Sequence, residues 1–538
     1  MPSQRIVLQQ ALTASEREAV AAFGAAHRGA GGLPELAAFL RERFGIALNL
    51  EPEIVLGFAA DSSNLPGRAD ALARPASERD CAAVLVACFA AGVPVTVSGG
   101  RSNLTGSATP AGGVVLSTVN LTAPGVRVDA AAGTAEVPAG VLLEDMRKAV
   151  GRESGGKLVF PVDPTSRAEA SVGGCISCNA SGFTPGETGA MRPWVEAVRL
   201  LLPDGSLVAA RRGQFVSEGG VFLLESGDGA GRTRELPVPA YERPRIKNAG
   251  GPFSASDGRM DFVDLAVGSE GLFGLVTGCT LRLAAAPAEH LDLFFSLADE
   301  PRAVRFLLAV HEKMQGDLGG LSALEYFGVN CRRYMKHESR FFRGEDQVGI
   351  YIREPLFEKD METAAGGWLE LMEESGCGVS DDAVMVLDNA PLGALFMEAR
   401  HSMPANALEV VQHRGTFTIM TDTVVPPAAF SAFLEFTHGL LAAEGLDYLS
   451  FGHFGDCHLH FTVLPRKDQL ERAVVAYDAV VAKSAELGGV YSGEHGTGKR
   501  KRKDFLRCYG AGAVEQVRRA KLAVDPELLV NRGNVFEG

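Results

Sequence analysis

The sequence predicts an α+β protein of more than one domain, and three features of its 538 residues lead to that prediction. From about residue 54 to residue 283, short Val- and Ile-rich runs alternate with glycine-rich turns. From about residue 284 onward, longer segments with helical periodicity alternate with strand-like runs. Hydrophobic residues make up 46% of the chain, which is enough to bury sizeable cores.

The first half begins with residues 1–50, whose apolar residues recur at helical spacing and predict a helical lead-in. Residues 80–91 have the same periodicity and lead into an expected strand at residues 93–97, VPVTV. Further strands are expected at residues 114–116 and 195–202. This mixture of elements indicates an α+β domain over residues 51–284.

The second half, residues 285–502, predicts a cap domain with an antiparallel sheet covered by helices on one side. Helices are expected at residues 303–315, 358–374 and 427–444, and strands at residues 347–352, 383–386 and 416–425. The last strand alternates polar and apolar residues, which is typical of an antiparallel strand with one solvated face. The tail, residues 503–538, predicts a helix followed by an irregular end.

Composition excludes several classes of protein. The net charge of −14 argues against a dedicated nucleic-acid binder, which needs a basic surface. The nine cysteines are scattered and include one CxxC pair, so a reducing compartment is favoured over a disulfide scaffold. No uncharged apolar run approaches 18 residues, and the first twenty residues lack the pattern of a signal peptide. We therefore expect a cytoplasmic protein.

Glycine-rich segments in the first domain are suited to bring bare main-chain N–H groups close to an anion. SGGRSNLTG (residues 98–106) directly follows the strand at 93–97, and SVGGCISCNASG (171–182) again combines paired glycines with small polar residues. GSEGLFG (268–274) is a third such segment. A single loop of this kind is usually an ordinary tight turn, but three in one domain favour a dinucleotide-type ligand. The first two lack the Rossmann and P-loop fingerprints.

The second domain contains a cluster of histidines and carboxylates. Its members are His453, Asp456, His458, His460, Glu494 and His495. If residues 457–464 form a strand, His458 and His460 share one face. Imidazole together with carboxylate suits zinc or another borderline divalent metal, so we expect a metal site here.

These segments carry a resemblance to a known family. SGGRSNLTG, then residues 160–182 and GSEGLFGLVTGCTLRL (268–283), resemble the PCMH-type FAD-binding half of the vanillyl-alcohol-oxidase superfamily. FGHFGDCHLHFTVLP (451–465) and SGEHGTG (492–498) resemble its branch of D-lactate dehydrogenases, glycolate oxidases and D-2-hydroxyglutarate dehydrogenases. The resemblance implies a two-lobed FAD domain and a cap, with residues 503–538 returning to the FAD domain.

The resemblance also implies which residues hold FAD. They are Gly99, Gly100, Arg101, Ser102, Asn103, Gly106, Ser171, Gly173, Gly174, Asn179, Ser181, Glu270, Gly271, Gly274 and Val276. Arg101 stands where many relatives have a third glycine, so its side chain either points away from the cofactor or contacts it. Residues 54–283 contain no histidine, and we expect FAD to be held non-covalently.

In metal-dependent relatives, the ion is bound by residues that correspond here to His453, His460 and Glu494. Zinc is the first expectation, with manganese or iron as alternatives. His458 is then either a fourth ligand or a supporting residue, and His495 becomes the general base that takes the proton of a substrate hydroxyl.

Arg400 corresponds to an arginine that relatives use near the substrate, where a guanidinium grips a carboxylate. The alternative is an ordinary surface arginine. Met420 stands where some relatives that bind a second carboxylate have a lysine, which argues against a dicarboxylate substrate. Cys175 and Cys178 leave open a redox role, although packing is favoured. The basic run at residues 499–503, KRKRK, is interpreted as a solvated helix start.

The resulting hypothesis is a flavoenzyme that oxidises a D-2-hydroxy acid, such as D-lactate, with help from a divalent metal. Because the CxxC pair stands alone, electrons must pass to an external quinone, electron-transfer flavoprotein, cytochrome or iron–sulfur subunit. Peripheral membrane contact and a homodimer stay open, as does a polypeptide that is inactive without partner chains. The alternatives are a flavoenzyme of the alkylglycerone phosphate synthase type and a zinc hydrolase without flavin.

Overall fold

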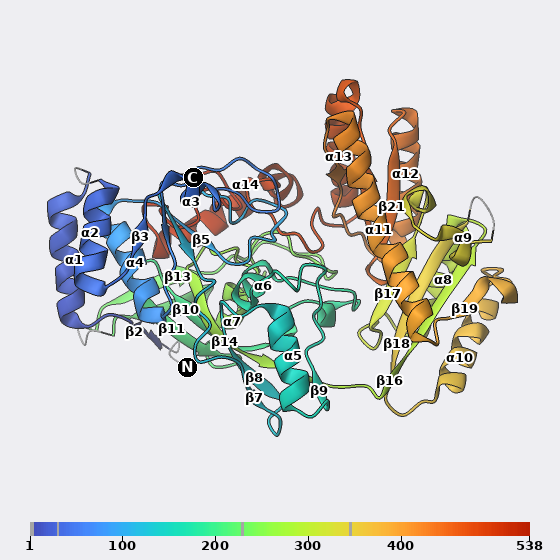
Figure 1. The fold of residues 1–538 in the computed structure, drawn as a ribbon, viewed down its shortest axis with the longest axis horizontal. Coiled ribbons are helices and arrows are strands. Elements are labelled where there is room, and N and C mark those ends of the chain that lie inside the picture. Colours follow the sequence, from blue (N-terminus) through green and yellow to red (C-terminus); the bar gives the residue numbers. More distant parts are fainter. Residues whose placement is uncertain (1–4, 30–31, 228–230, 344–346) are drawn as a thin grey trace.

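The computed structural model describes residues 5–29, 32–227, 231–343 and 347–538. It has mixed helices and sheets, which confirms the predicted α+β fold class. Figure 1 shows two large bodies, with the first part of the chain on the left and the yellow and orange cap on the right. No helix in the described part of the chain is both long and apolar enough to cross a membrane.

The first lobe contains a four-stranded sheet of order β3-β4-β6-β5, in which β6 pairs in parallel with both β4 and β5. Its elements are α1 (Ala14–His27), α2 (Leu33–Phe44), β3 (Leu48–Asn49), α3 (Pro52–Leu56), β4 (Ala71–Ala73), α4 (Glu78–Ala91), β5 (Val95–Ser98) and β6 (Val114–Ser117). Helix α4 begins where the Ser77 hydroxyl accepts the Asp80 N–H, and it ends at Gly92, which has a φ of 71°. Strand β5 therefore delivers the chain directly into the first glycine-rich segment.

The second lobe contains a six-stranded antiparallel sheet of order β2-β11-β10-β14-β8-β7. Its strands are β2 (Gln9–Gln10), β7 (Arg127–Asp129), β8 (Thr134–Pro138), β10 (Val195–Leu201), β11 (Ser206–Arg211) and β14 (Leu275–Arg282). Smaller elements of this half are β1 (Arg5–Val7), α5 (Leu143–Glu153), β9 (Leu158–Val159), α6 (Val172–Cys178), β12 (Val221–Glu225), β13 (Thr233–Pro237), α7 (Phe262–Ala266) and β15 (Ala284–Ala285). The N-terminal region is thus not purely helical as predicted, because β1, β2 and β3 each join a sheet.

The cap is built on a seven-stranded antiparallel sheet of order β19-β16-β18-β17-β21-β22-β20. Its strands are β16 (Glu289–Leu297), β17 (Ala323–Phe327), β18 (Val348–Leu356), β19 (Val384–Val386), β20 (Ile419–Met420), β21 (Tyr448–His453) and β22 (His458–Val463). The strand predicted at residues 416–425 is confined to Ile419–Met420, and beyond it only Val424 makes isolated bridges.

Helices cover both faces of the cap sheet, which corrects the prediction of one covered face. The first face packs against α8 (Glu300–Lys313), α10 (Met361–Glu374), α12 (Phe430–Ala443) and α13 (Leu470–Glu486). The second packs against α11 (Ala390–Arg414) and the short α9 (Glu338–Phe341). Phe295 belongs to the first core and its neighbour Phe294 to the second, as the alternation of a strand requires.

The last helix, α14 (Arg502–Val524), lies in red over the first half of the chain in Figure 1. Its residues Phe505, Val517 and Val524 join the first hydrophobic core. Beyond the helix, the Val95 N–H donates to the Leu529 carbonyl at 2.8 Å, and the Asn531 N–H donates to the Val95 carbonyl at 2.8 Å. The end of the chain therefore braces β5, the strand that precedes the first glycine-rich segment.

Candidate active site

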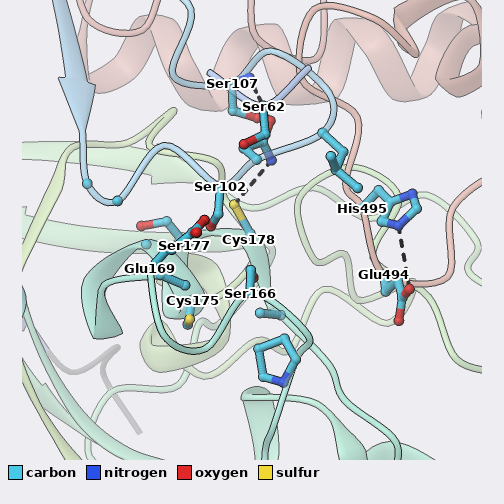
Figure 2. A pocket seen from close by; sticks show the side chains of 18 of the residues that line it. Ser62, Ser102, Ser107, Ser166, Glu169, Cys175, Ser177, Cys178, Glu494 and His495 are labelled. Carbon is cyan, nitrogen blue, oxygen red and sulfur yellow. Dashed lines mark hydrogen bonds and ion pairs between the residues drawn. The ribbon is translucent and has the colours of Figure 1, made fainter. Parts of the chain in front are cut away.

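A cavity of about 600 Å³ lies where the glycine-rich segments meet the cap. Residues from the segments 99–104, 171–178 and 270–276 line one part of it, and Arg400, His453, His460, Glu494 and His495 line another. Figure 2 shows His495 and Glu494 on one side of the cavity, and Ser102, Ser177 and Cys178 on the other. The two groups of sequence motifs thus meet at one space.

Close packing of the glycine-rich segments requires glycine. A Cβ on Gly99 would lie 2.4 Å from the Ser171 hydroxyl oxygen, and one on Gly100 would lie 1.9 Å from the Glu169 carbonyl oxygen. Gly173 lets α6 approach Ala139, where a Cβ would come within 2.6 Å. These contacts build a cradle of exposed main chain that fits a dinucleotide.

Thirteen of the fifteen predicted cofactor residues line the cavity. They are Gly99, Gly100, Arg101, Ser102, Asn103, Ser171, Gly173, Gly174, Ser181, Glu270, Gly271, Gly274 and Val276. Gly106 and Asn179 do not line it. Gly106 has a φ of 83° and packs against Leu65, whereas Asn179 ends α6 with a φ of 49° and accepts the Arg192 N–H at 3.0 Å. Both residues therefore stabilise the conformation of the loops without lining the cavity.

Arg101 has a φ of 61°, in the left-handed region that favours glycine. Its guanidinium donates to the Gly57 carbonyl and lies 4.4 Å from the centre of the Phe58 ring. Its own carbonyl accepts the Ser62 N–H at 3.0 Å. Arg101 therefore ties residues 57–62 to the first glycine-rich segment, and these contacts direct its guanidinium toward residues 57 and 58.

The CxxC pair consists of free thiols. Burial raises the pKa of the Cys175 thiol to about 12. The Asn103 amide nitrogen lies 3.7 Å from the sulfur of Cys178, and burial raises the pKa of that thiol as well. Cys178 is only partly buried and lines the cavity together with Cys175. Thiols with a raised pKa stay protonated and are poor nucleophiles, so the raised pKa values favour the packing interpretation.

The histidine cluster is carried by the sheet of the cap. His453 ends β21, and His458 and His460 share one face of β22, as predicted from the period of a strand. His453 Nε2 lies 3.1 Å from Glu494 Oε2, and His460 Nε2 lies 3.2 Å from Glu494 Oε1. His460 Nδ1 faces the Thr421 carbonyl at 3.1 Å, and this contact orients the ring.

The predicted ligands meet at Glu494, but they do not form one compact trio. Among the described residues, two groups hold candidate ligand atoms within 4.8 Å of one another, and both include Glu494. One comprises His453, His458 and Glu494, and the other comprises Asp422, His460, Glu494 and His495. His458 Nε2 lies 2.9 Å from Asp422 Oδ1, and burial lowers the pKa of His458 to about 3. We infer that His458 is neutral and that its Nε2–H donates to Asp422.

Four charged residues that sequence reasoning missed hold this cluster together. Asp422 is fully buried, and its carboxylate accepts the Lys501 ammonium at 2.8 Å and the Ser492 hydroxyl at 2.6 Å. Glu325 Oε1 lies 2.8 Å from His453 Nδ1. Lys247 is buried, with its Nζ 3.3 Å from Asp456 and 3.6 Å from Glu494. Although burial and Lys247 oppose it, Glu494 and Glu325 raise the pKa of His453 to about 9.

The basic run at residues 499–503 is not the solvated helix start that the sequence predicted. Lys501 is 4% exposed and pairs with Asp422, and Lys499 donates to Asn534 Oδ1 at 2.7 Å. Lys503, which pairs with Asp478, is half exposed. A run of like charges is usually solvated, but the buried carboxylate of Asp422 draws Lys501 inward.

Arg400 lies on α11 with 11% of its side chain exposed, so it is not a surface arginine. Its guanidinium pairs with Glu325 and lies 4.1 Å from the centre of the Phe183 ring. Arg400 lines the cavity beside His453 and His460. Helix α11 thereby brings a cation to the same space as the predicted metal ligands.

Two protein families match the chain. Residues 69–211 match the FAD binding domain, and residues 358–535 match the C-terminal domain of FAD linked oxidases. D-lactate dehydrogenase of Anaerostipes hadrus is 25% identical over 501 residues, covering 90% of this chain and 93% of that protein. D-2-hydroxyglutarate dehydrogenase of Xanthomonas citri pv. viticola is 29% identical over 478 residues, covering 87% of this chain and 89% of that protein. The resemblance inferred from the motifs is thereby confirmed.

Solved structures share the fold at low sequence identity. A p-cresol methylhydroxylase structure with substrate bound aligns with a TM-score of 0.66 and 13% identity, covering 98% of this chain and 99% of that one. Alkyldihydroxyacetonephosphate synthase aligns with a TM-score of 0.64 and 15% identity, covering 93% of this chain and 84% of that one. At such identities the comparison concerns the fold alone.

Replacing Lys501 tests the buried pair with Asp422. We expect Lys501→Met to lower the free energy of unfolding by about 3–5 kcal/mol, because it leaves a buried carboxylate without its cation. Lys503→Met is the matched control, with an expected effect below about 1 kcal/mol, since an exposed ion pair contributes little. Urea denaturation of both variants measures the difference. Equal losses in the two variants would contradict this account.

Proposed function

Since this chain belongs to the FAD-linked oxidases and carries their FAD-binding domain of the PCMH type, we propose that it oxidises a small D-2-hydroxy acid to the 2-oxo acid. The observation that carries the proposal is that His495 and Glu494 line the same cavity as the three glycine-rich segments. The proposal also draws on the names of the two dehydrogenases above. The flavin domain argues against a zinc hydrolase without flavin.

In the proposed reaction, the α-hydroxyl loses its proton and the α-carbon loses a hydride, so that a carbonyl replaces the alcohol. FAD, held non-covalently against residues 99–103, 171–181 and 270–276, supplies the acceptor of the two electrons. His495 takes the hydroxyl proton. Its Nδ1 lies 3.4 Å from Asp422 and its Nε2 lies 3.5 Å from Glu494, so two carboxylates stabilise the imidazolium that forms.

The charge of the cluster supports a divalent cation. Among the described residues of the cluster, three cationic side chains (Arg400, Lys247 and Lys501) face four carboxylates (Glu325, Asp422, Asp456 and Glu494). With His453 protonated, as its raised pKa indicates, the metal-free cluster is balanced in charge. A divalent ion that displaces this proton and is held by His453, His460 and Glu494 would leave one net positive charge, which a monocarboxylate substrate would balance. Such an ion lowers the pKa of a bound hydroxyl. Zinc suits this donor set, and manganese or iron are alternatives.

The walls of the cavity support a substrate with one carboxylate and an apolar side chain. Arg400 provides the guanidinium for the carboxylate. Around it, the cavity is lined by Phe183, Pro404, Met420 and Phe451. Met420 offers no cation for a second carboxylate. Lactate and longer aliphatic 2-hydroxy acids fit this chemistry, and the electrons leave the flavin to an external acceptor.

Anaerobic reduction of the flavin by a panel of 2-hydroxy acids tests the proposed reaction. D-Lactate and longer aliphatic D-2-hydroxy acids should bleach the flavin absorbance, whereas their L-enantiomers and D-2-hydroxyglutarate should react more slowly. The reason is that a single anchoring cation and an apolar wall favour monocarboxylates. If no D-2-hydroxy acid bleaches the flavin, the dehydrogenase proposal is wrong, and a chemistry of the alkylglycerone phosphate synthase type becomes the better candidate.

Arg400→Ala tests the carboxylate anchor. We expect KM for the hydroxy acid to rise by the equivalent of roughly 2–4 kcal/mol, because a buried carboxylate loses its charged partner. In Arg400→Ala, Glu325 keeps His453 as a partner but loses its guanidinium. The double variant R400A/E325Q also removes the Glu325 charge, and it should recover part of the lost stability while KM stays high. Steady-state kinetics and thermal unfolding of both proteins make the measurement. An unchanged KM in Arg400→Ala would remove Arg400 from the substrate site.

Removal of the metal and replacement of two histidines separate binding from chemistry. The chelated protein and His460→Ala should keep FAD but resist reduction by substrate, since the hydroxyl loses its ion. His495→Ala should keep both metal and FAD, with reduction slower by roughly 10²–10⁴-fold, the usual contribution of a positioned acid–base group. His413→Ala, on an exposed turn of α11, is the control. Metal content is measured by elemental analysis, and flavin reduction by anaerobic stopped-flow spectroscopy. Reduction of the metal-free protein at the wild-type rate would contradict the metal-assisted mechanism.

A further inference from the structure

Glu270 lies in the GSEGLFG segment of the FAD domain, and groups of the protein itself satisfy its carboxylate. The Thr497 N–H donates to Oε1 at 2.7 Å and the Gly498 N–H donates to Oε2 at 2.6 Å. The Ser107 hydroxyl also donates to Oε2. Glu270 is 4% exposed, so these donors take the place of water. The cofactor resemblance implied contact with FAD, but the carboxylate is directed to the loop at residues 492–498.

The main chain of Glu270 is fixed as firmly as its side chain. Its φ of 51° lies in the left-handed region, and its N–H donates to the Ser177 carbonyl near the end of α6 at 2.7 Å. Its carbonyl accepts the Asn534 side-chain amide at 3.0 Å. Glu270 therefore joins α6, the C-terminal segment and the loop at residues 492–498 at one point.

The loop at residues 492–498 is held from two sides. Asp422 of the cap accepts the Glu494 N–H at 3.3 Å and the His495 N–H at 3.0 Å. Glu270 of the FAD domain accepts the N–H groups of the next half of the loop. Gly498 also packs so closely against Thr105 that an added Cβ would lie 2.2 Å from the Thr105 carbonyl oxygen. The side chain of Glu494 leaves the main chain at the Asp422 attachment, and that of His495 leaves it between the Asp422 and Glu270 attachments.

We propose that Glu270 is a positioning residue that sets the loop carrying Glu494 and His495 and couples its order to occupancy of the flavin site. The segment at residues 270–276 lines the cavity, so a cofactor bound against it restrains Glu270 and, through Glu270, the loop. Coupling of this kind is reciprocal, because a loop held in place also favours the bound cofactor. The catalytic part of the inference rests on the proposed role of His495, whereas the coupling itself does not.

Hydrogen exchange of the wild-type protein tests the coupling. FAD is removed and restored, and exchange of the Thr497 and Gly498 amides is compared with that of the Val424 amide, which donates to Val490 within the cap. We expect protection of Thr497 and Gly498 to fall at least about tenfold without FAD, while Val424 changes little. Equal protection of Thr497 and Gly498 with and without FAD overturns the coupling. This experiment uses only the wild-type protein and FAD, and it does not require the substrate to be known.

Glu270→Gln tests the positioning role in the FAD-loaded protein. An amide has one acceptor oxygen where the carboxylate has two, so one of the two main-chain N–H groups loses its acceptor. At saturating FAD we expect an unchanged flavin spectrum, faster exchange of Thr497 or Gly498, and flavin reduction slower by about 10- to 100-fold. Reciprocal coupling also predicts a higher Kd for FAD in this variant. KM should change little, because Arg400 is untouched. Glu235→Gln, at an exposed position of the same domain, should match the wild type.

The outcomes separate the two proposals. Unchanged exchange of the loop in FAD-loaded Glu270→Gln overturns the positioning role, because the side chain then does not hold the loop. If wild-type protein is not reduced by any D-2-hydroxy acid, the proposed function fails while the exchange experiments still decide the role of Glu270. If Glu270→Gln does not fold, the wild-type comparison with and without FAD decides the proposal.

Discussion

The arrangement of the site depends on two buried carboxylates that accept the main-chain N–H groups of one loop. Asp422 receives the N–H groups of Glu494 and His495, and Glu270 receives those of Thr497 and Gly498. Buried N–H groups without acceptors are costly, so the loop stays where both carboxylates reach it. The two acceptors belong to different domains. The loop therefore lies against both the cap sheet and the cofactor cavity.

Local patterns predicted the elements whose signals are complete within a short stretch of sequence. The apolar periodicity of residues 80–91 predicted α4, and VPVTV at residues 93–97 predicted β5. Helix α11 went unpredicted, because Pro404 within it is a typical helix-ending signal. Its buried residues, among them Phe396, Met403 and Val411, nevertheless recur at helical spacing against the second face of the sheet. Tertiary packing decided the helix in this case.

The same distinction explains which parts of the site were predictable. His453, His460 and Glu494 stand in motifs whose residue types carry the chemistry, and the fold brings them together. Asp422 and Lys501 lie 79 residues apart. Asp422 stands in none of the recognised motifs, and Lys501 stands in a basic run that the sequence predicted to be solvated. A buried lysine is recognisable only once its partner is located, because the desolvated charge needs that partner. The sequence alone therefore indicated the candidate ligands but not the charges that surround them.

In the proposed reaction, the cap and the FAD domain contribute different contacts to one substrate. Glu325 on β17 links Arg400 to His453, so the anchor for the carboxylate and a candidate metal ligand share one rigid support. The flavin acceptor would lie on the other side, against the glycine-rich segments that line the cavity. Carboxylate, hydroxyl and α-hydrogen are then directed to three separate places, and three such contacts distinguish the enantiomers of a 2-hydroxy acid. Lys247 of the FAD domain pairs with Asp456 and Glu494, and these ion pairs fix the position of the cap relative to the FAD domain.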